Sequence, residues 1–99
     1  MRYFEWDDQK AASNEVKHGV RFADATRAFD DTYVLTEGDR VVDSEERWRT
    51  IGLAGSRLLF VAHTVREERF DEVIRIISAR KATKAERRRY GQNHKKNDG

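Results

Sequence analysis

The stretch Val73-Ile74-Arg75-Ile76-Ile77-Ser78-Ala79-Arg80 is the most β-prone run of the chain, because branched apolar residues dominate it. Two arginines lie inside it or at its end, where a buried strand ordinarily carries none. Shortly after it, Thr83-Lys84-Ala85-Glu86 has the pattern of a capping box and predicts the start of a basic helix. The sequence therefore predicts a central strand with arginine on one face, an arrangement suited to holding phosphates.

Length and composition indicate one small folded domain. The 99 residues suffice for a single core that buries roughly 60–65 % of the unfolded surface. Charged residues make up 38 % of the chain and hydrophobic ones 37 %, but the latter are clustered and periodic, which favours a folded domain with a charged surface. There is no cysteine, which excludes disulfides and suits a reducing, cytoplasmic compartment. We find no signal peptide and no long apolar run, so we expect no membrane association.

The net charge of +2 conceals an asymmetry between the two halves of the chain. Residues 1–50 hold 8 Lys or Arg against 12 Asp or Glu, whereas residues 51–99 hold 12 against 6. A basic half on a nearly neutral protein favours a polyanion or an acidic protein as the partner. A solvated charged surface with no partner explains the same counts.

Local patterns predict a short strand and two helices in the first third of the chain. Residues 2–6 alternate and predict the strand, and Asp7 or Asp8 can cap the helix that follows. Gly19 is placed to end that helix in the left-handed conformation. Residues 22–29 predict a second helix, with Phe22, Ala25 and Phe29 on one apolar face.

The rest of the chain predicts an antiparallel sheet and a closing helix. Residues 30–43 are polar and indicate a surface connection, with a brief strand candidate at 33–35. The predicted strands are 47–53, 58–66 and 73–80, and the predicted helix is 83–90. We expect residues 1–90 to form the domain and 91–99 to be a disordered tail.

A register for the two hairpins predicts which side chains share a face of the sheet. We expect Leu53 to pair with Arg57, and Arg66 to pair with Glu72. One face is then apolar and should receive the second helix; it consists of Trp48, Thr50, Leu58, Phe60, Ala62, Ile74 and Ile76. The other face carries Arg47, Arg49, His63 and Arg75. Unless a partner covers that face, its like charges repel one another, and a slip of one residue would scatter the set.

This set of residues suits the cleavage of RNA. Guanidinium groups make bidentate contacts with phosphates, and histidine exchanges a proton near neutral pH. Together they could orient an RNA backbone and stabilise the phosphorane that forms when a 2′-hydroxyl attacks. That route requires no metal or cofactor, and the three histidines show no spacing of metal ligands.

Structural roles explain several of the same residues. His18 lies in the last turn of the first helix, where a cation is favourable. His63 could be a half-buried histidine of the sheet, and Arg75 could pair with Glu46 or Glu72. The run of arginines at 87–89 is typical of a solvated helix face.

Five motifs resemble the BrnT family of toxins over about residues 4–90. They are Phe4-Glu5-Trp6-Asp7, then Asn14 with Lys17-His18-Gly19-Val20 and Phe22, then Glu46-Arg47 with Ile51-Gly52, then Thr64-Val65-Arg66, then Arg75-Ile76-Ile77-Ser78-Ala79-Arg80 with Glu86 and Tyr90. The blocks at 17–20 and 75–80 are specific when they occur together.

The resemblance implies an α+β fold of the RelE-like kind, in which a strand and two helices precede an antiparallel sheet of about three to four strands and a C-terminal helix. It also implies a metal-independent endoribonuclease that inhibits translation and growth, the toxin of a type II toxin–antitoxin pair. The partner would be a BrnA-like antitoxin with a ribbon-helix-helix part, in a complex that we expect to be heterotetrameric and to bind operator DNA. A non-catalytic basic interaction module, or a degenerate toxin kept as a co-repressor, would have the same fold.

The resemblance and the face prediction together define the candidate site. Arg47, Arg75 and Arg80 lie in the shared motifs and are the candidates for contacting phosphate and transition-state charge. His18, with His63 as its competitor, is the candidate for proton transfer. Glu46 could position or deprotonate the 2′-hydroxyl, unless it pairs with an arginine. The candidate RNA-binding residues are Lys17, Arg49, Arg66 and Ser78, and the role of Tyr90 is left open.

Overall fold

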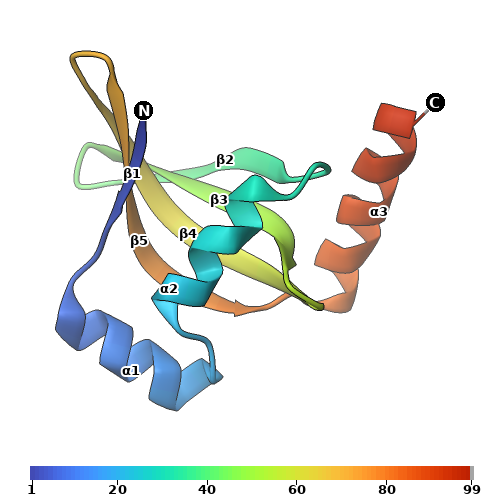
Figure 1. Ribbon diagram of the computed structural model, residues 1–99, viewed down its shortest axis with the longest axis horizontal. Coiled ribbons are helices and arrows are strands. Elements are labelled where there is room, and N and C mark those ends of the chain that lie inside the picture. The colour runs from blue at the N-terminus through green and yellow to red at the C-terminus, as the bar shows by residue number, and fades with distance from the viewer. Residues whose placement is uncertain (99) are drawn as a thin grey trace.

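A five-stranded mixed sheet with helices on both sides forms the protein (Figure 1). The computed structural model describes residues 1–98, with side chains described through Lys95. The elements are β1 (Arg2–Glu5), α1 (Asp8–His18), α2 (Phe22–Ala25), the 3₁₀ helix η1 (Thr26–Asp30), β2 (Leu35–Val42), β3 (Glu45–Ala54), β4 (Arg57–Glu68), β5 (Asp71–Lys81) and α3 (Lys84–Asp98). The strand order is β1-β5-β4-β3-β2; β1 runs parallel to β5, and the other neighbours are antiparallel.

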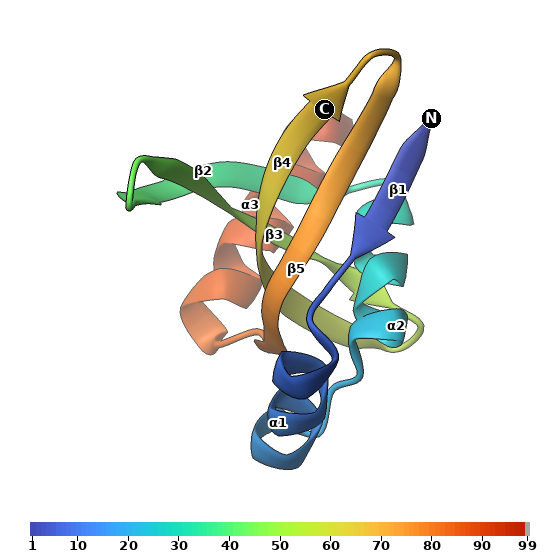
Figure 2. The same cartoon turned by 90° about the vertical axis from the view of Figure 1, so that its left-hand side faces the viewer.

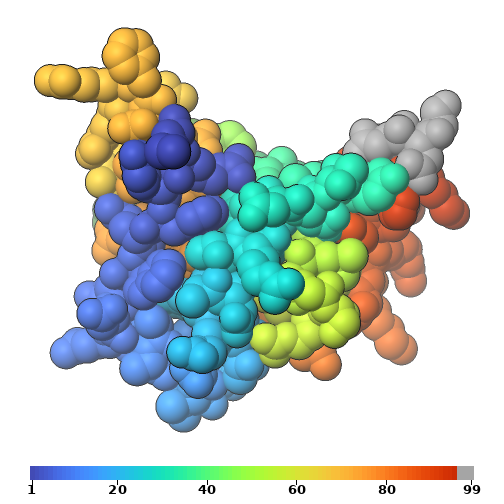
Figure 3. Space-filling model, viewed as in Figure 1, coloured from blue at the N-terminus to red at the C-terminus, as the bar shows by residue number. Residues whose placement is uncertain are grey.

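The N-terminal helices cover one face of the sheet, called here the helix face. Its core joins Val20, Phe22 and Phe29 to Leu59, Val61, Ile74 and Ile76 of the strands. In the space-filling view of this side, α2 and η1 lie in front of the sheet, α1 lies beside its lower end, and the tip of the β4–β5 hairpin projects beyond them (Figure 3). On the other side α3 packs against one end of the sheet, where Tyr90 meets a second cluster around Ile51, Leu58 and Ala82 (Figure 2).

The predicted ends of two helices are confirmed. The Asp7 side chain accepts a hydrogen bond from the Lys10 N–H at 3.0 Å and caps α1, which Gly19 ends at φ 68°. Before α3, the Glu86 N–H donates to Thr83 Oγ1 and the Thr83 N–H donates to a Glu86 carboxylate oxygen, at 3.2 and 2.8 Å. These reciprocal bonds are the predicted capping box.

Other elements differ from the prediction. The sheet has five strands rather than three to four, because the polar segment expected as a connection contains all of β2. The predicted second helix is a single turn of α2 followed by η1. The helix α3 continues through residues 91–98, where we expected a tail; Gly99 lies outside the described residues. Over residues 1–98, no helix is long and apolar enough to cross a membrane.

The predicted register was wrong by one residue in both hairpins. Leu53 pairs with Leu58 rather than Arg57, and Arg66 pairs with Val73 rather than Glu72. The reason is that both hairpins close through two-residue turns, which place a positive φ at Gly55 and at Arg69. Because of these two errors, the side chains of β4 lie on the face opposite to the predicted one, while those of β3 and β5 lie on their predicted faces.

Candidate nucleic-acid interface

The face of the sheet opposite α1 and α2 carries Arg47 and Arg49 from β3 and Arg75 and Arg80 from β5; we call it the arginine face. Opposite residues of neighbouring strands share a face. Arg80 lies opposite Phe60, which lies opposite Ile51 of the cluster under α3. Ser78 lies opposite Ala62, which lies opposite Arg49. Arg75 lies opposite Thr64, two residues from Ala62 on β4, and Arg47 lies two residues from Arg49 on β3. The prediction that Arg47, Arg49 and Arg75 share a face is therefore confirmed.

A β-bulge brings Arg75 and Arg80 to the same face. The two residues are five positions apart, so strict alternation would direct them to opposite faces. The register shifts between the pairs His63–Ile76 and Ala62–Ser78, which leaves Ile77 as the extra residue of β5. The bulge thus places Ser78 and Arg80 on the arginine face while Ala79 stays in the core.

Carboxylates of neighbouring residues compensate the charge of Arg47 and Arg49. The Nε of Arg49 lies 3.4 Å from Glu37 and its Nη1 lies 3.7 Å from Asp39, both on β2, and the Nε of Arg47 lies 3.8 Å from Glu45. The expected mutual repulsion is therefore offset. These contacts are loose, because neither Nε finds a hydrogen-bond acceptor among the described residues.

Arg80 is held more tightly than the other arginines of this face. Its two Nη atoms donate to both carboxylate oxygens of Glu86 at 2.8 and 2.9 Å, and its guanidinium lies 4.1 Å from the centre of the Phe60 ring. The hydrogen bonds from Arg80 lower the pKa of Glu86. These contacts fix the start of α3 on the sheet, which favours a structural role for Arg80.

Arg75 has no ion pair or hydrogen bond among the residues that the structure describes, and it is exposed. Arg75 lies opposite Glu5 of the neighbouring strand β1. Both carboxylate oxygens of Glu5, however, accept hydrogen bonds from Arg66, at 2.7 and 3.1 Å. Arg66 also donates to Glu68 at 2.8 Å, so this candidate RNA-binding residue is already paired. The hydrogen bonds from Arg66 hold the pKa of Glu5 below its usual range, and the charge of Arg75 adds to this. Neither pairing considered for Arg75, with Glu46 or Glu72, is formed.

The prediction that His63 shares a face with the arginines is wrong, since the turned β4 places it on the helix face. Its side chain is buried, its Nε2 lies 2.7 Å from Thr50 Oγ1, and the Phe29 ring packs edge-on against it at 5.0 Å. Burial lowers the pKa of His63 to about 4, so the ring is neutral at pH 7. Glu46 is likewise apart from the arginine face: it precedes Arg47 on the strand, lies opposite Val41 and is exposed.

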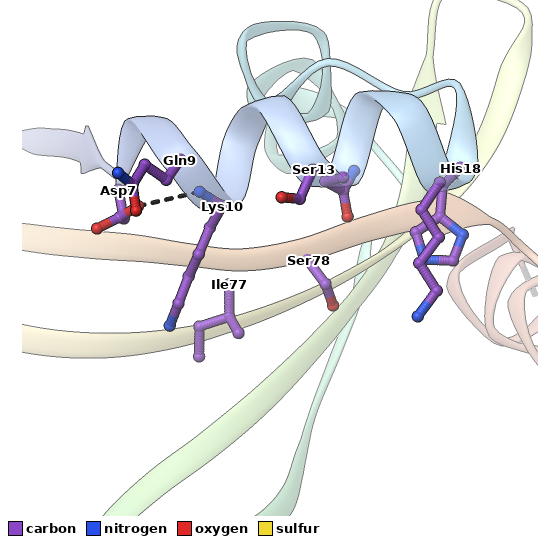
Figure 4. A pocket seen from close by; sticks show the side chains of 9 residues that line it. Asp7, Gln9, Lys10, Ser13, His18, Ile77 and Ser78 are labelled. Carbon is purple, nitrogen blue, oxygen red and sulfur yellow. Dashed lines mark hydrogen bonds between the residues drawn. The ribbon is translucent and has the colours of Figure 1, made fainter.

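Lys17, His18 and Ser78 lie together in a groove between α1 and β5 (Figure 4). The groove has a volume of about 460 Å³, and its other lining residues are Asp7, Gln9, Lys10, Ser13, Asn14 and Ile77. Because Ser78 also belongs to the arginine face, the groove borders that face along β5. The sequence prediction missed Lys10 here, although it lies seven residues before Lys17 and therefore on the same side of the helix.

Tyr90 has a structural partner that the sequence prediction also missed. Its hydroxyl donates to Asp31 Oδ2 at 2.6 Å, and the same carboxylate accepts hydrogen bonds from the Leu53 and Tyr33 amides. Burial raises the pKa of Asp31, but these hydrogen bonds outweigh it and the pKa lies below its ordinary value. Tyr90 therefore anchors α3, and the only sequence signal for this contact was its position about two turns after Thr83 of the capping box.

The fold and these surfaces define a small α+β protein with arginines on an open sheet face and lysines in an adjoining groove. The family described as "Ribonuclease toxin, BrnT, of type II toxin-antitoxin system" matches residues 6–86, and the chain belongs to this family. The predicted resemblance is thereby confirmed. No curated protein matches the chain closely enough to be named as a relative.

Proposed function

We propose that this chain cleaves RNA on its arginine face, without a metal, by attack of a 2′-hydroxyl on the adjacent phosphorus. In this reaction the bond from phosphorus to the 5′-oxygen breaks, which leaves a 2′,3′-cyclic phosphate and a 5′-hydroxyl. The 2′-hydroxyl loses a proton and the 5′-oxygen gains one. Cleavage would inhibit translation and growth, as the family implies.

The exposed, unpaired guanidinium of Arg75 carries the proposal. A phosphorane gains negative charge on its non-bridging oxygens, and a fixed cation stabilises that charge more in the transition state than in the ground state. Arg47 and Arg49 lie on the same face, and their loose contacts with carboxylates allow either to exchange for a phosphate. His18 is the candidate for proton transfer rather than buried His63, because it shares the groove with Ser78 at the border of this face.

The partner in this proposal is a BrnA-like antitoxin with a ribbon-helix-helix part, in a heterotetramer that binds operator DNA. A type II toxin–antitoxin family implies an antitoxin partner. That the antitoxin is BrnA-like is inferred from the resemblance to BrnT toxins. The RelE-like classification of the fold belongs to the same proposal. A small neighbouring gene with a ribbon-helix-helix pattern would support this assignment.

The test is incubation of the purified, antitoxin-free chain with RNA in EDTA, followed by analysis of the product ends. The expected result is 5′-hydroxyl products from the wild type and at least a hundredfold slower cleavage by Arg75→Ala, about the effect of removing one transition-state donor. Arg87→Ala is the matched control, because Arg87 is exposed on α3, outside the strands that carry the arginine face. Equal cleavage by the Arg75 variant would remove this residue from the mechanism.

One observation favours a second function, a non-catalytic module that binds RNA or an acidic protein. Most arginines of the sheet are already paired with carboxylates, which leaves few cations to stabilise the charge of a transition state. This alternative predicts RNA binding with no cleavage products at high protein excess, and no growth arrest on expression.

A further inference from the structure

The α1–β5 groove exists because β1 is short. β1 pairs with β5 only from Glu72 to Arg75, so the remaining edge of β5 has no neighbouring strand. The side chain of Asn14 takes over part of that pairing: its Nδ2 donates to the Ala79 carbonyl at 2.8 Å, and its Oδ1 accepts from the Ala79 N–H at 3.1 Å. The same Nδ2 donates to the Val20 carbonyl at 3.0 Å. Asn14 is buried, so α1 lies at a fixed position beside the strand.

The bulge in β5 shapes the floor of the groove. Ile77 is the extra residue, and it and Ser78 turn toward the side of the sheet that carries the arginines. In the close view, Lys10 and His18 extend from α1 on the same side as Ile77 and Ser78 (Figure 4). Lys17 also lines this groove. The groove therefore continues the arginine face beyond β5, with basic side chains at both of its ends.

The charge in this groove is less compensated than that of the arginine face. Lys10 and Lys17 form no ion pair with any residue that the structure describes. The one carboxylate in the lining is Asp7, which caps α1 through the Lys10 N–H. Seven residues of helix separate the two lysines, about 10 Å along the axis. That span exceeds a single phosphate group and suits a length of backbone.

We propose that the α1–β5 groove binds the phosphates of an RNA strand next to the phosphate that is cleaved, with Lys10 and Lys17 as its cationic contacts. This inference rests on the proposed function for the identity of the ligand. The strand would lie over Ser78, between Arg75 and the two lysines. The groove then adds affinity for longer RNA and leaves the chemistry to the arginine face.

Salt-dependent binding of an uncleavable 2′-O-methyl oligoribonucleotide tests this proposal. For single strands, the logarithmic slope of affinity against salt is about −0.7 per phosphate contacted. The double variant Lys10→Ala/Lys17→Ala should therefore lower the magnitude of the slope by about 1.4. Between about 50 and about 200 mM salt, the variant should lose about sevenfold less affinity than the wild type loses. The matched control is Arg87→Ala/Arg88→Ala, which removes the same charge from the exposed face of α3.

The outcomes separate this inference from the ribonuclease proposal, because cleavage of unmodified RNA is measured on the same preparations. A double variant that keeps the wild-type slope, or a control that loses as much, overturns the groove even if the wild type cleaves RNA. A wild type that cleaves nothing, but whose slope falls as expected in the double variant, overturns the ribonuclease and leaves the groove as a binding site. A Lys10→Arg/Lys17→Arg variant should keep the wild-type slope, and its failure would also overturn the groove.

Discussion

At the scale of single residues, the arginines of one sheet face divide by whether a neighbour compensates their charge. Arg80 has two hydrogen bonds to Glu86 and an aromatic ring beneath it, whereas Arg75 has neither. Charge-assisted bidentate pairs are stronger than ordinary hydrogen bonds, and stacking on a ring adds to them. We therefore expect that replacing Arg80 lowers the stability of the fold, whereas replacing Arg75 lowers the activity and leaves the stability nearly unchanged.

Arg80→Ala should lower the free energy of unfolding by about 1 kcal/mol, because the partly exposed pair with Glu86 holds the start of α3. Urea unfolding of Arg80→Ala, Glu86→Ala and the double variant measures the coupling between the two side chains. We expect a coupling of about 0.5–1 kcal/mol. Additive effects of the two single changes would contradict a structural pair, and Arg75→Ala should leave stability within about 0.5 kcal/mol of the wild type.

His63 should make the protein less stable in acid. The pKa of His63 is about 4 in the folded protein and 6.5 when exposed. Between these values the unfolded chain binds a proton that the folded chain does not. The unfolding free energy therefore falls as the pH falls from 6.5 to 4, by about 3 kcal/mol in total.

The measurement for His63 is urea unfolding of the wild type and His63→Gln at pH 7 and pH 4.5. Glutamine can still hydrogen-bond Thr50 but does not titrate. The wild type should lose about 2–3 kcal/mol more than the variant over this interval. An equal loss in both proteins would show that carboxylates alone cause the acid sensitivity.

At the scale of the elements, local signals predicted what local contacts determine. Both ends of α1 and the start of α3 follow from caps within a few residues, and the structure has them where the sequence indicates. The predicted hairpin registers were wrong because both hairpins close through two-residue turns. These turns need a positive φ at Gly55 and, less expectedly for a non-glycine residue, at Arg69. The sequence of residues 73–80 does not predict that Ile77 is an extra residue, since the position of a bulge depends on how β5 packs against its partner strand β4. Because the register errors displaced β4 alone, the arginines of β3 and β5 could be grouped from the sequence but His63 of β4 could not be placed.

Packing of η1 against β3 depends on Gly52, which belongs to one of the family-like motifs. A Cβ at this position would lie 2.3 Å from the Ala28 carbonyl oxygen, an atom of the backbone that cannot move aside. Gly52→Ala should therefore destabilise the protein by about 2 kcal/mol or more. Gly38→Ala on β2 is the control, because the nearest atom is 3.9 Å away on the Trp48 side chain. Thermal unfolding compares them, and equal melting temperatures would show that η1 does not rest on Gly52.

At the scale of the whole molecule, the candidate site is assembled from segments far apart in the chain. The arginine face needs β3 and β5, and the groove beside it needs α1 held by Asn14 against Ala79. Residue types and motifs could nominate Arg75, Lys17, His18 and Ser78 from the sequence. They could not show that Arg66 binds Glu5, because that pair joins strands far apart in the chain. They could not show that Glu37 and Asp39 compensate Arg49, because β2 was predicted as a surface connection.

The helix α3 is attached to the sheet at the end of the arginine face where Tyr90 packs. Asp31 accepts hydrogen bonds from Tyr90 of α3 and from the Leu53 amide of β3, so one carboxylate joins helix and sheet. Tyr90→Phe removes the bond to the helix but keeps the ring in its apolar cluster. We expect this variant to lose about 1 kcal/mol of stability and to exchange the amide hydrogens of α3 faster, while the amides of β4 and β5 keep their protection. Hydrogen exchange read residue by residue checks this, with Tyr3→Phe as a comparison at a half-exposed tyrosine of β1. Faster exchange throughout the sheet would mean that α3 supports the whole fold, and unchanged exchange in α3 would mean that Arg80–Glu86 and Arg89–Glu37 hold the helix without Asp31.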